Sequence, residues 1–339
     1  MGHLPLVSIG IPNYNYSRYI ATTLNSVASQ TYPNIELIII DDCSTDNSVA
    51  VIEEWITKYQ GSFKINFIKN LINQGLTKVC NQVLHEAGGK YFQTLDADDL
   101  LLPGKIEQQV RLLEGKINTA FIYSNIGVID ENGNMINADY LGRIGYNKDE
   151  MPEGNIFEKL FEFNFIPLPS VLVNTAFAKS VGGFDSTLQV QDYYLWLKLS
   201  EQYDTIYQAE STALYRVHSG SMSNSSISNP KSYDSILTIK FRYYQSVNPH
   251  IKKIIRKNIH SIGTYLYKFN YPTAVQWLKK DVLLNPGFKS ITYYTAIRLG
   301  IPFDLFEKVK SKFYDAFKAK TEISFLVFCL GAIYDFTLK

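Results

Sequence analysis

The stretch LDADD, residues 95–99, places three carboxylates directly after an apolar run that is typical of a buried strand. Asp96 and Asp98 are two residues apart, so on extended backbone their side chains point to the same side. Such a pair can bind Mg²⁺ or Mn²⁺ and leave coordination positions open for phosphate oxygens, whereas without a cation the like charges repel. We therefore predict a metal ligand at Asp98, with Asp96 beside it. The alternative is that Asp98 and Asp99 only cap the helix near Pro103, and for Asp98 we favour the metal.

The elements that position these carboxylates alternate between strand and helix patterns. Each strand is followed by a polar segment, namely PNYN, DDCSTD, NQG or DADD. This alternation predicts right-handed βαβ units in a parallel sheet, in which ligands bind outside the carboxyl ends of the strands. The predicted strands are 6–11, 35–40, 65–70 and 91–95, and the predicted helices begin near 19, 48 and 79. The four polar segments should therefore meet at one edge.

Beyond residue 113 the alternation is less regular. Residues 120–136 are typical of a hairpin, with Asn132-Gly133 as a two-residue turn. We expect a strand at 169–174, a helix that begins close to Asp192, and one returning strand over 205–218. The Ser- and Asn-rich stretch 219–230 has little to bury and predicts a loop and a domain boundary.

From residue 231 onward the sequence shows only helical patterns. Residues 267–288 resemble a single tetratricopeptide-type helical hairpin, and 302–320 alternate aromatic and basic residues at helical spacing. For 302–320 we favour a helix packed on the rest of the protein, with peripheral attachment to an anionic membrane as the alternative. The apolar run 323–336 is shorter than the roughly 20 residues of a spanning helix, so a buried or interfacial helix is expected.

Composition excludes several classes of function. The 339 residues include 33 Lys and Arg against 32 Asp and Glu, which gives no long-range field for binding nucleic acid. The sequence has neither a P-loop nor a G-x-G-x-x-G segment, which argues against kinases and dehydrogenases. Cys43, Cys80 and Cys329 are far apart, and the N-terminus lacks a signal-peptide pattern, so a cytoplasmic protein with reduced thiols is expected.

The ordered set of motifs resembles the family 2 glycosyltransferases, inverting sugar-nucleotide enzymes with a GT-A fold. The similar segments are VSIGIPNYNYSRYIATTLNSVASQTYPNIELIIIDDCSTDNS, NQG, GKYFQTLDADDLLLP, GGFD and QDYYLWLKL, and they extend from Val7 to about Ser223. The resemblance implies an α/β, Rossmann-like, mostly parallel twisted sheet flanked by helices, with an α-helical C-terminal module. The expected domains are 1–225, with a nucleotide-sugar half (1–113) and an acceptor half (114–225), and a helical region 226–339.

On the donor side, the resemblance implies that Pro12, Tyr14 and Asp42 surround the base and ribose, with Asn73 and Gly75 in a loop beside the nucleotide. An aromatic face at Tyr14 and a carboxylate acceptor at Asp42 suit uracil, so a UDP-sugar is favoured. The alternatives are an ordinary loop aromatic at Tyr14, a helix-capping carboxylate at Asp42 and a simple positive φ at Gly75.

The resemblance also implies a metal and phosphate site. Asp98 matches the metal ligand, and Asp96 lies beside it and the donor's sugar or ribose. His218 is expected to be a further ligand of metal or phosphate, and Arg216 to bind phosphate. The expected cofactor is Mn²⁺ or Mg²⁺.

Asp192 matches the catalytic base, which takes the proton of the acceptor hydroxyl as that hydroxyl attacks the anomeric carbon. The alternative is a carboxylate that only stabilises the start of a helix. The chain departs from the commoner Glu-Asp pattern because Gln191 precedes Asp192, and Gln191 adds no charge to raise the pKa of the base. This departure leaves open a non-catalytic sugar-nucleotide-binding or scaffold subunit of a polysaccharide-assembly complex.

Together these features predict a metal-dependent, inverting transferase. It would move one sugar from a nucleotide-sugar to a hydroxyl of a glycan or lipid-linked oligosaccharide in bacterial surface polysaccharide synthesis. The expected location is the cytoplasm. Contact with the inner face of the cell membrane through the C-terminal helices and assembly of several copies are left open.

Overall fold

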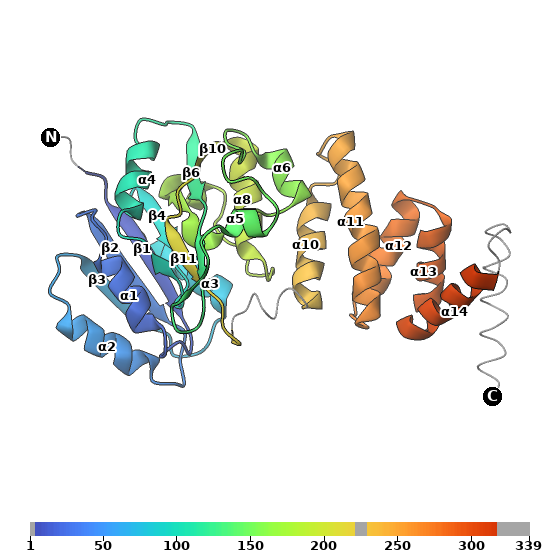
Figure 1. The fold of residues 1–339 in the computed structure, drawn as a ribbon, viewed down its shortest axis with the longest axis horizontal. Coiled ribbons are helices and arrows are strands. Elements are labelled where there is room, and N and C mark those ends of the chain that lie inside the picture. Colours follow the sequence, from blue (N-terminus) through green and yellow to red (C-terminus); the bar gives the residue numbers. More distant parts are fainter. Residues whose placement is uncertain (1–3, 221–228, 317–339) are drawn as a thin grey trace. The chain divides into compact units, whose positions relative to one another are not determined.

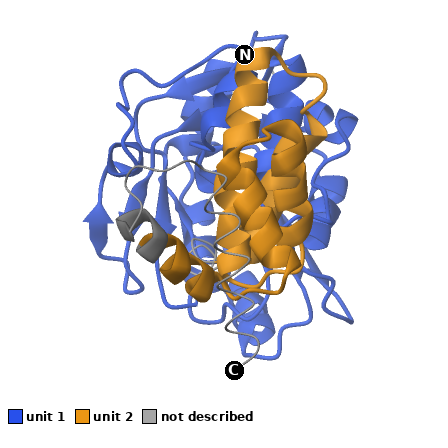
Figure 2. Cartoon of the chain, turned by 90° about the vertical axis from the view of Figure 1, so that its right-hand side faces the viewer, with its two compact units in different colours: residues 1–225 blue, residues 226–339 orange. Residues whose placement is uncertain are grey.

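The computed structural model describes residues 4–220 and 229–316, with side chains up to residue 311. The chain divides into two compact units, Met1–Ser225 and Ser226–Lys339 (Figure 2). The first unit is a mixed α/β domain, and the described part of the second unit is helical (Figure 1).

The first unit is built on a seven-stranded sheet in the order β10-β6-β9-β4-β1-β2-β3. Its pairs are parallel except those of β9, which is antiparallel to β4 and to β6. The strands are β1 Val7–Asn13, β2 Ile35–Asp41, β3 Lys64–Lys69, β4 Tyr91–Thr94, β6 Thr119–Ser124, β9 Leu172–Asn174 and β10 Asp204–Gln208. The predicted, mostly parallel sheet is confirmed.

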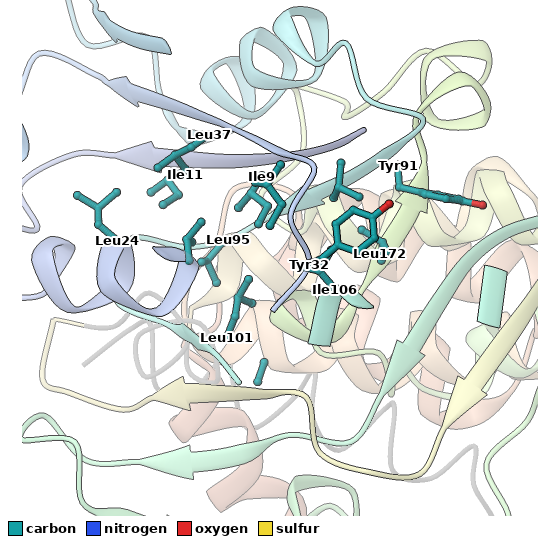
Figure 3. Close-up of a cluster of buried hydrophobic side chains, with 14 of the residues drawn as sticks. Ile9, Ile11, Leu24, Tyr32, Leu37, Tyr91, Leu95, Leu101, Ile106 and Leu172 are labelled. Atoms are coloured by element: carbon teal, nitrogen blue, oxygen red, sulfur yellow. The ribbon is translucent and has the colours of Figure 1, made fainter. Parts of the chain in front are cut away.

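The core lies on one face of this sheet, because alternate residues of each strand point to the same side. Val7, Ile9 and Ile11 of β1 are fully buried there with residues of the neighbouring strands (Figure 3). The helices α1 Ile20–Ala28, α2 Ser48–Lys58 and α4 Lys105–Leu113 cover that face with Leu24, Ile52 and Ile106, among others.

Helix α3, Leu76–Glu86, packs closely on the other face of β1. A Cβ atom on Gly10 would lie only 1.8 Å from Cγ1 of Val83. Glycine is therefore required at this point of β1, since any side chain would push α3 away from the sheet.

A small second sheet, with the order β5-β11-β7-β8, lies outside the predicted pattern. It joins β5 Leu100–Leu101, β7 Gly127–Ile129, β8 Met135–Asn137 and β11 Ala213–Arg216. The predicted hairpin exists as β7 and β8, but its turn is wider than two residues: Asp130 accepts the N–H groups of Asn132 and Asn134. Only Gly133 has a positive φ there, whereas a type I′ turn needs two such residues.

The rest of the first unit carries short elements: α5 Tyr140–Arg143, α6 Phe157–Glu162, the 3₁₀ turn η1 Leu168–Ser170, and α7 Thr175–Ser180. The helix expected close to Asp192 is α8, Gln191–Gln202. The single strand expected over 205–218 is wrong: β10 pairs with β6 in the large sheet, and β11 pairs in the small one.

The second unit contains α10 Pro230–Arg242, α11 Pro249–Lys268, α12 Ala274–Leu284, α13 Phe288–Arg298 and α14 Phe303–Ala316, and neighbouring helices in this order pack together. The segment that resembles a helical hairpin, 267–288, contains the end of α11, all of α12 and the first residue of α13. Within the described ranges, none of the helices is long and apolar enough to cross a membrane. The apolar run 323–336 and Cys329 lie outside the described residues, and Cys43 and Cys80 are free thiols.

Candidate functional site

The loops after β1 and β2 are fastened to each other at the carboxyl edge of the sheet. The Asp41 carboxylate accepts hydrogen bonds from the Asn13 amide at 2.7 Å and from the Ser44 hydroxyl at 2.6 Å. Asn15, with φ of +61°, accepts the N–H groups of Thr45 and Asp46. These side chains hold the two loops in one arrangement.

Asp42 is buried and holds the loop after β3. Its Oδ1 atom accepts from the Asn70 amide at 2.9 Å, and its two oxygens accept the backbone N–H groups of Gln74 and Gly75 at 2.8 to 3.0 Å. Gly75 adopts the expected positive φ, +89°, directly before α3. Asp42 does not cap a helix: Asp46 instead accepts the N–H of Ser48 at the start of α2.

The other predicted donor-side residues surround this frame. Pro12 is buried on β1, whereas the Tyr14 side chain in the following loop is 43% exposed. Asn73 is exposed, and its amide donates to the Asp42 carbonyl at 3.3 Å. The exposed ring and the polar amide lie on loops that follow β1 and β3, at the carboxyl ends of these strands.

The three carboxylates after β4 form an acidic cluster, Asp96, Asp98 and Asp99. Burial and the charges of Asp98 and Asp192 raise the pKa of Asp96 to about 7. Burial also raises the pKa of Asp98 and that of Asp99, and for Asp99 the charges of the other two add to the effect. One oxygen of Asp99, Oδ2, is buried without a hydrogen-bond partner. Arg216 lowers the pKa values of Asp98 and Asp99, but its charge does not offset the burial and mutual repulsion of the cluster.

His218 lies against the acidic cluster, 120 residues along the chain from its partner. Its Nε2 atom is 2.9 Å from Oδ2 of Asp98, and both side chains are buried. The imidazole packs 4.7 Å from the ring of Tyr19 and edge-on to Tyr16 at 6.0 Å. The structure thus brings together two residues that were predicted as metal ligands.

Arg216 is more buried than expected for a phosphate ligand. The side chain is 4% exposed, with Nε donating to the Asp98 carbonyl at 2.8 Å and Nη1 to the Asp130 carbonyl at 3.2 Å. The guanidinium also lies 5.1 Å from the Tyr19 ring centroid. These contacts favour a positioning role, in which Arg216 fixes the backbone of the acidic cluster.

The alternative role of Asp99 as a helix cap is wrong. Gly104 precedes α4 without a side-chain cap, and Oδ1 of Asp99 instead accepts the backbone N–H of Arg216 at 2.9 Å. Asp99 therefore links the segment after β4 to β11, so that His218, two residues beyond Arg216, reaches Asp98.

Asp192 lies in the first turn of α8, and it approaches the acidic cluster closely enough for its charge to raise the pKa of Asp96. Burial raises the pKa of Asp192 itself. Gln191 beside it is buried and uncharged. A carboxylate with a raised pKa, near other carboxylates at a strand edge, is a suitable proton acceptor.

Asp98 and His218 suit a divalent ion whose remaining ligands come from a bound molecule. Across the described ranges no group of three or more His, Cys, Asp or Glu side chains could hold a metal ion without further ligands. Asp98 and His218 supply an oxygen and a nitrogen 2.9 Å apart, which is about the separation of neighbouring ligands on one octahedral ion. Such an ion would need further ligands, for example phosphate oxygens.

Sequence reasoning missed three tyrosines of the site. Burial and the charges of Asp98 and Asp96 raise the pKa of the Tyr16 phenol, and Tyr19 carries the contacts to His218 and Arg216. Burial and the charge of Asp192 raise the pKa of Tyr140. The clustered tyrosines of YNYSRY weakly indicate a role for Tyr16 and Tyr19. The sequence around Tyr140 contains no comparable pattern.

Comparison with known sequences identifies a family and relatives. The family described as Glycosyl transferase family 2 matches residues 8–166. An uncharacterized glycosyltransferase of Haemophilus influenzae is 30% identical over 301 residues, which cover 86% of each chain. The chondroitin synthase of Escherichia coli is 30% identical over 198 residues, 58% of this chain and 27% of that protein.

Solved structures show the same fold. TarS of S. aureus, residues 1–349 in complex with UDP-GlcNAc, has a TM-score of 0.58 at 16% identity, and the match covers 87% of this chain and 92% of that 1–349 chain. The mannosyltransferase PcManGT of Pyrobaculum calidifontis, in complex with GDP-Man and Mn²⁺, has a TM-score of 0.56 at 15% identity, over 88% of this chain and 81% of that one.

Proposed function

The chain belongs to the family 2 glycosyltransferases and is a transferase, and from this we propose an inverting, metal-dependent enzyme that moves one sugar from a nucleotide-sugar to an acceptor hydroxyl. The observation that carries the proposal is the meeting of Asp192, from α8, with the acidic cluster after β4. Nearly one hundred residues separate them in the sequence, yet the charge of Asp192 raises the pKa of Asp96.

On the donor side, the nucleotide lies over the loops after β1, β2 and β3. Tyr14 supplies an exposed ring for the base, while Asp42 keeps the 70–75 loop in place and Asn73 offers an amide at the same edge. A UDP-sugar is our favoured donor. The neighbouring structures hold UDP-GlcNAc in one case and GDP-Man in the other, so the fold alone suits either nucleotide.

For the metal we propose Mn²⁺ or Mg²⁺, which Asp98 and His218 would hold with Asp96 as a further ligand. When bound, such an ion stabilises the negative charge that builds on the leaving diphosphate. Arg216 positions Asp98 through its backbone carbonyl, and Asp99 fixes β11. A Mn²⁺ complex of PcManGT supports the choice of ion.

Asp192 acts as the base in this proposal. The acceptor hydroxyl is oriented by the carboxylate of Asp192 and transfers its proton to that carboxylate as the new glycosidic bond forms. Inversion needs no second protein carboxylate as an acid, because the diphosphate leaves without a proton. The buried Gln191 leaves Asp192 without a second negative charge beside it, so the base can be ionised at lower pH than with Glu at that position.

We propose a glycan or lipid-linked oligosaccharide in bacterial surface polysaccharide synthesis as the acceptor class. The chondroitin synthase among the relatives supports a polysaccharide product, although this chain spans about a quarter of that protein. The cytoplasmic location, contact with the inner membrane face and self-assembly stay predictions.

The test is hydrolysis of a panel of UDP- and GDP-sugars by the purified chain, with Mn²⁺, with Mg²⁺ and with EDTA. We expect slow release of one nucleotide, only when a divalent ion is present, and faster release when a suitable glycan acceptor is added. Equal release with EDTA would disprove the metal site. Donor binding without hydrolysis or transfer to any acceptor would favour the non-catalytic alternative.

A further inference from the structure

A mixed polar and aromatic pocket lies within the helical unit, apart from the residues assigned above. Its volume is about 240 Å³, and it opens between α10 and α12. Its walls combine charged, amide, hydroxyl and aromatic side chains, including Asp234, Phe241, Arg242, Gln276, Trp277 and Lys280. We refer to it as the α10/α12 pocket.

Lys280 forms the most unusual part of the pocket. Its ammonium lies 4.0 Å from the ring centroid of Phe241 and 4.1 Å from that of Trp277, so two aromatic rings hold one cation. Among the described residues it has no hydrogen-bond acceptor and no ion pair. Partial burial lowers the pKa of Lys280, and the charge of Asp234 partly offsets this effect. Its three N–H donors can therefore serve a ligand that enters the pocket.

Asp234 lines the same pocket, and one of its two carboxylate oxygens accepts hydrogen bonds. Oδ1 accepts from the Thr273 hydroxyl at 2.6 Å and from the Trp277 indole at 2.7 Å. Within the described part of the chain Oδ2 receives no hydrogen bond. The pocket therefore offers unsatisfied donors on Lys280 and an unsatisfied anionic acceptor on Asp234.

We infer that the α10/α12 pocket binds an acidic sugar unit of a glycan chain. A sugar carboxylate would accept from Lys280, and sugar hydroxyls would donate to Asp234 and exchange hydrogen bonds with the Gln276 amide. Phosphate and sulfate fit less well, because they lack the sugar hydroxyl donors that the Asp234 carboxylate and the Gln276 amide could accept. The volume lies below the roughly 300 Å³ at which pockets for drug-sized ligands begin, which suits one ring and excludes a nucleotide-sugar.

The role of this pocket in glycan synthesis rests on the proposed function. A transferase that elongates an acidic polysaccharide gains affinity when a second part of the chain holds the same glycan, since the second contact is then intramolecular. The binding itself does not depend on catalysis, so the two can be tested separately.

The experiment is calorimetric titration of the full chain with short oligogalacturonates, with neutral oligosaccharides of the same length and with inorganic phosphate. We expect binding of the acidic oligosaccharide only. Lys280→Met should weaken it by about tenfold or more, the effect of losing one charge-assisted hydrogen bond. Lys280→Arg should retain most of the affinity. The matched control is Lys279→Met, which removes an exposed lysine from the same helix.

The outcomes separate this inference from the proposed function. Loss of acidic-glycan binding in Lys280→Met, with donor hydrolysis unchanged and a normal thermal melt, supports the pocket. Glycan binding without any donor hydrolysis would refute the proposed function and leave the pocket intact. Equal binding by Lys280→Met and Lys279→Met, equal affinity for neutral glycans, or no binding of acidic glycans by the wild-type chain would overturn the inference. Tight binding of phosphate that depends on Lys280 would also overturn it, in favour of an anion site.

Discussion

The ends of β2 and β4, on either side of β1 in the same sheet, differ in how the surrounding residues satisfy their carboxylates. At the end of β2, Asp41 and Asp42 are buried and accept hydrogen bonds from backbone and side-chain donors on both oxygens. After β4, Asp96, Asp98 and Asp99 are held close together, their pKa values are raised, and one oxygen of Asp99 has no partner.

The comparison distinguishes carboxylates that stabilise the fold from carboxylates that are available to bind a cation. Hydrogen bonds satisfy the carboxylates at β2, so that strand end is complete in the folded chain and holds three loops. The carboxylates after β4 raise the free energy of the folded chain through mutual repulsion and desolvation, and a bound cation would remove that penalty. We therefore expect substitutions at β2 to lower stability and substitutions after β4 to lower activity.

The largest effect is expected for Asp98→Asn. Because the variant loses one proposed metal ligand, the rate of donor hydrolysis with Mn²⁺ should fall by about 10³-fold. The melting temperature without metal should change little, since a repelling charge disappears together with one hydrogen bond. Steady-state kinetics and a thermal melt measure the two quantities. A large drop in melting temperature with full activity would reverse the assignment of the two strand ends.

Asp192→Asn tests the base. Transfer to an acceptor should fall by about 10² to 10³-fold, because the acceptor hydroxyl loses its proton acceptor, while donor affinity stays within about twofold. Titration calorimetry with the donor and a transfer assay measure the two effects. Undiminished transfer would exclude Asp192 as the base.

Asp42→Asn tests the other strand end. The amide group would face the N–H groups of Gln74 and Gly75, so two charge-assisted hydrogen bonds are weakened and the free energy of unfolding should fall by about 2 kcal/mol. The melting temperature should drop by about 4 to 8 °C. Asp149→Asn, at an exposed loop position, is the control, and equal melting temperatures of the two variants would contradict the structural role.

The pH dependence of stability should differ between the wild type and Asp96→Asn. The pKa of Asp96 is raised from 3.8 to about 7 in the folded chain, so the folded state binds more protons than the unfolded state between these values. In EDTA the free energy of unfolding should therefore decrease as pH rises through this range, by at most about 4 kcal/mol, since one pKa unit corresponds to about 1.4 kcal/mol. Denaturant titrations of wild type and Asp96→Asn measure it. The same decrease in both would exclude Asp96 as its source.

The smallest effect concerns Gln191→Glu. A second carboxylate beside Asp192 should raise the pKa of the base and move the acidic limb of the pH–rate profile for transfer to higher pH, with a change in maximal rate of only about a few fold. Gln191→Met is the uncharged control. An unshifted profile would mean that residue 191 does not face the base.

Local sequence patterns predicted most of the large sheet and its helices, but not the small second sheet. Strands such as 35–40 and the helix with Ile20, Leu24 and Val27 follow from periodicity, and the strand-end rule placed the four polar segments on one edge. The small sheet was missed because its short strands become stable only through pairing with distant partners, as in the bond between Asp99 and Arg216 across 117 residues.

The contacts of Arg216 could not be predicted from the sequence either. A residue type indicates what a side chain can bind, but three-dimensional packing decides that this guanidinium donates to the Asp98 and Asp130 carbonyls. The split of 205–218 into β10 and β11 likewise depends on which sheet each half meets, and nothing in the residues themselves distinguishes one continuous strand from two.

The antiparallel strand β9 lies between β4 and β6 in the finished sheet, although it follows both in the sequence. During synthesis on the ribosome, β4 can pair with β1 as soon as residue 94 has emerged, but its other edge stays open until residues 172–174 are made. An open edge next to the apolar residues Tyr91 and Phe92 can recruit strands of other chains. Nascent chains that stop before β9 should therefore aggregate, and chaperones that cover apolar strand edges should bind them over this interval.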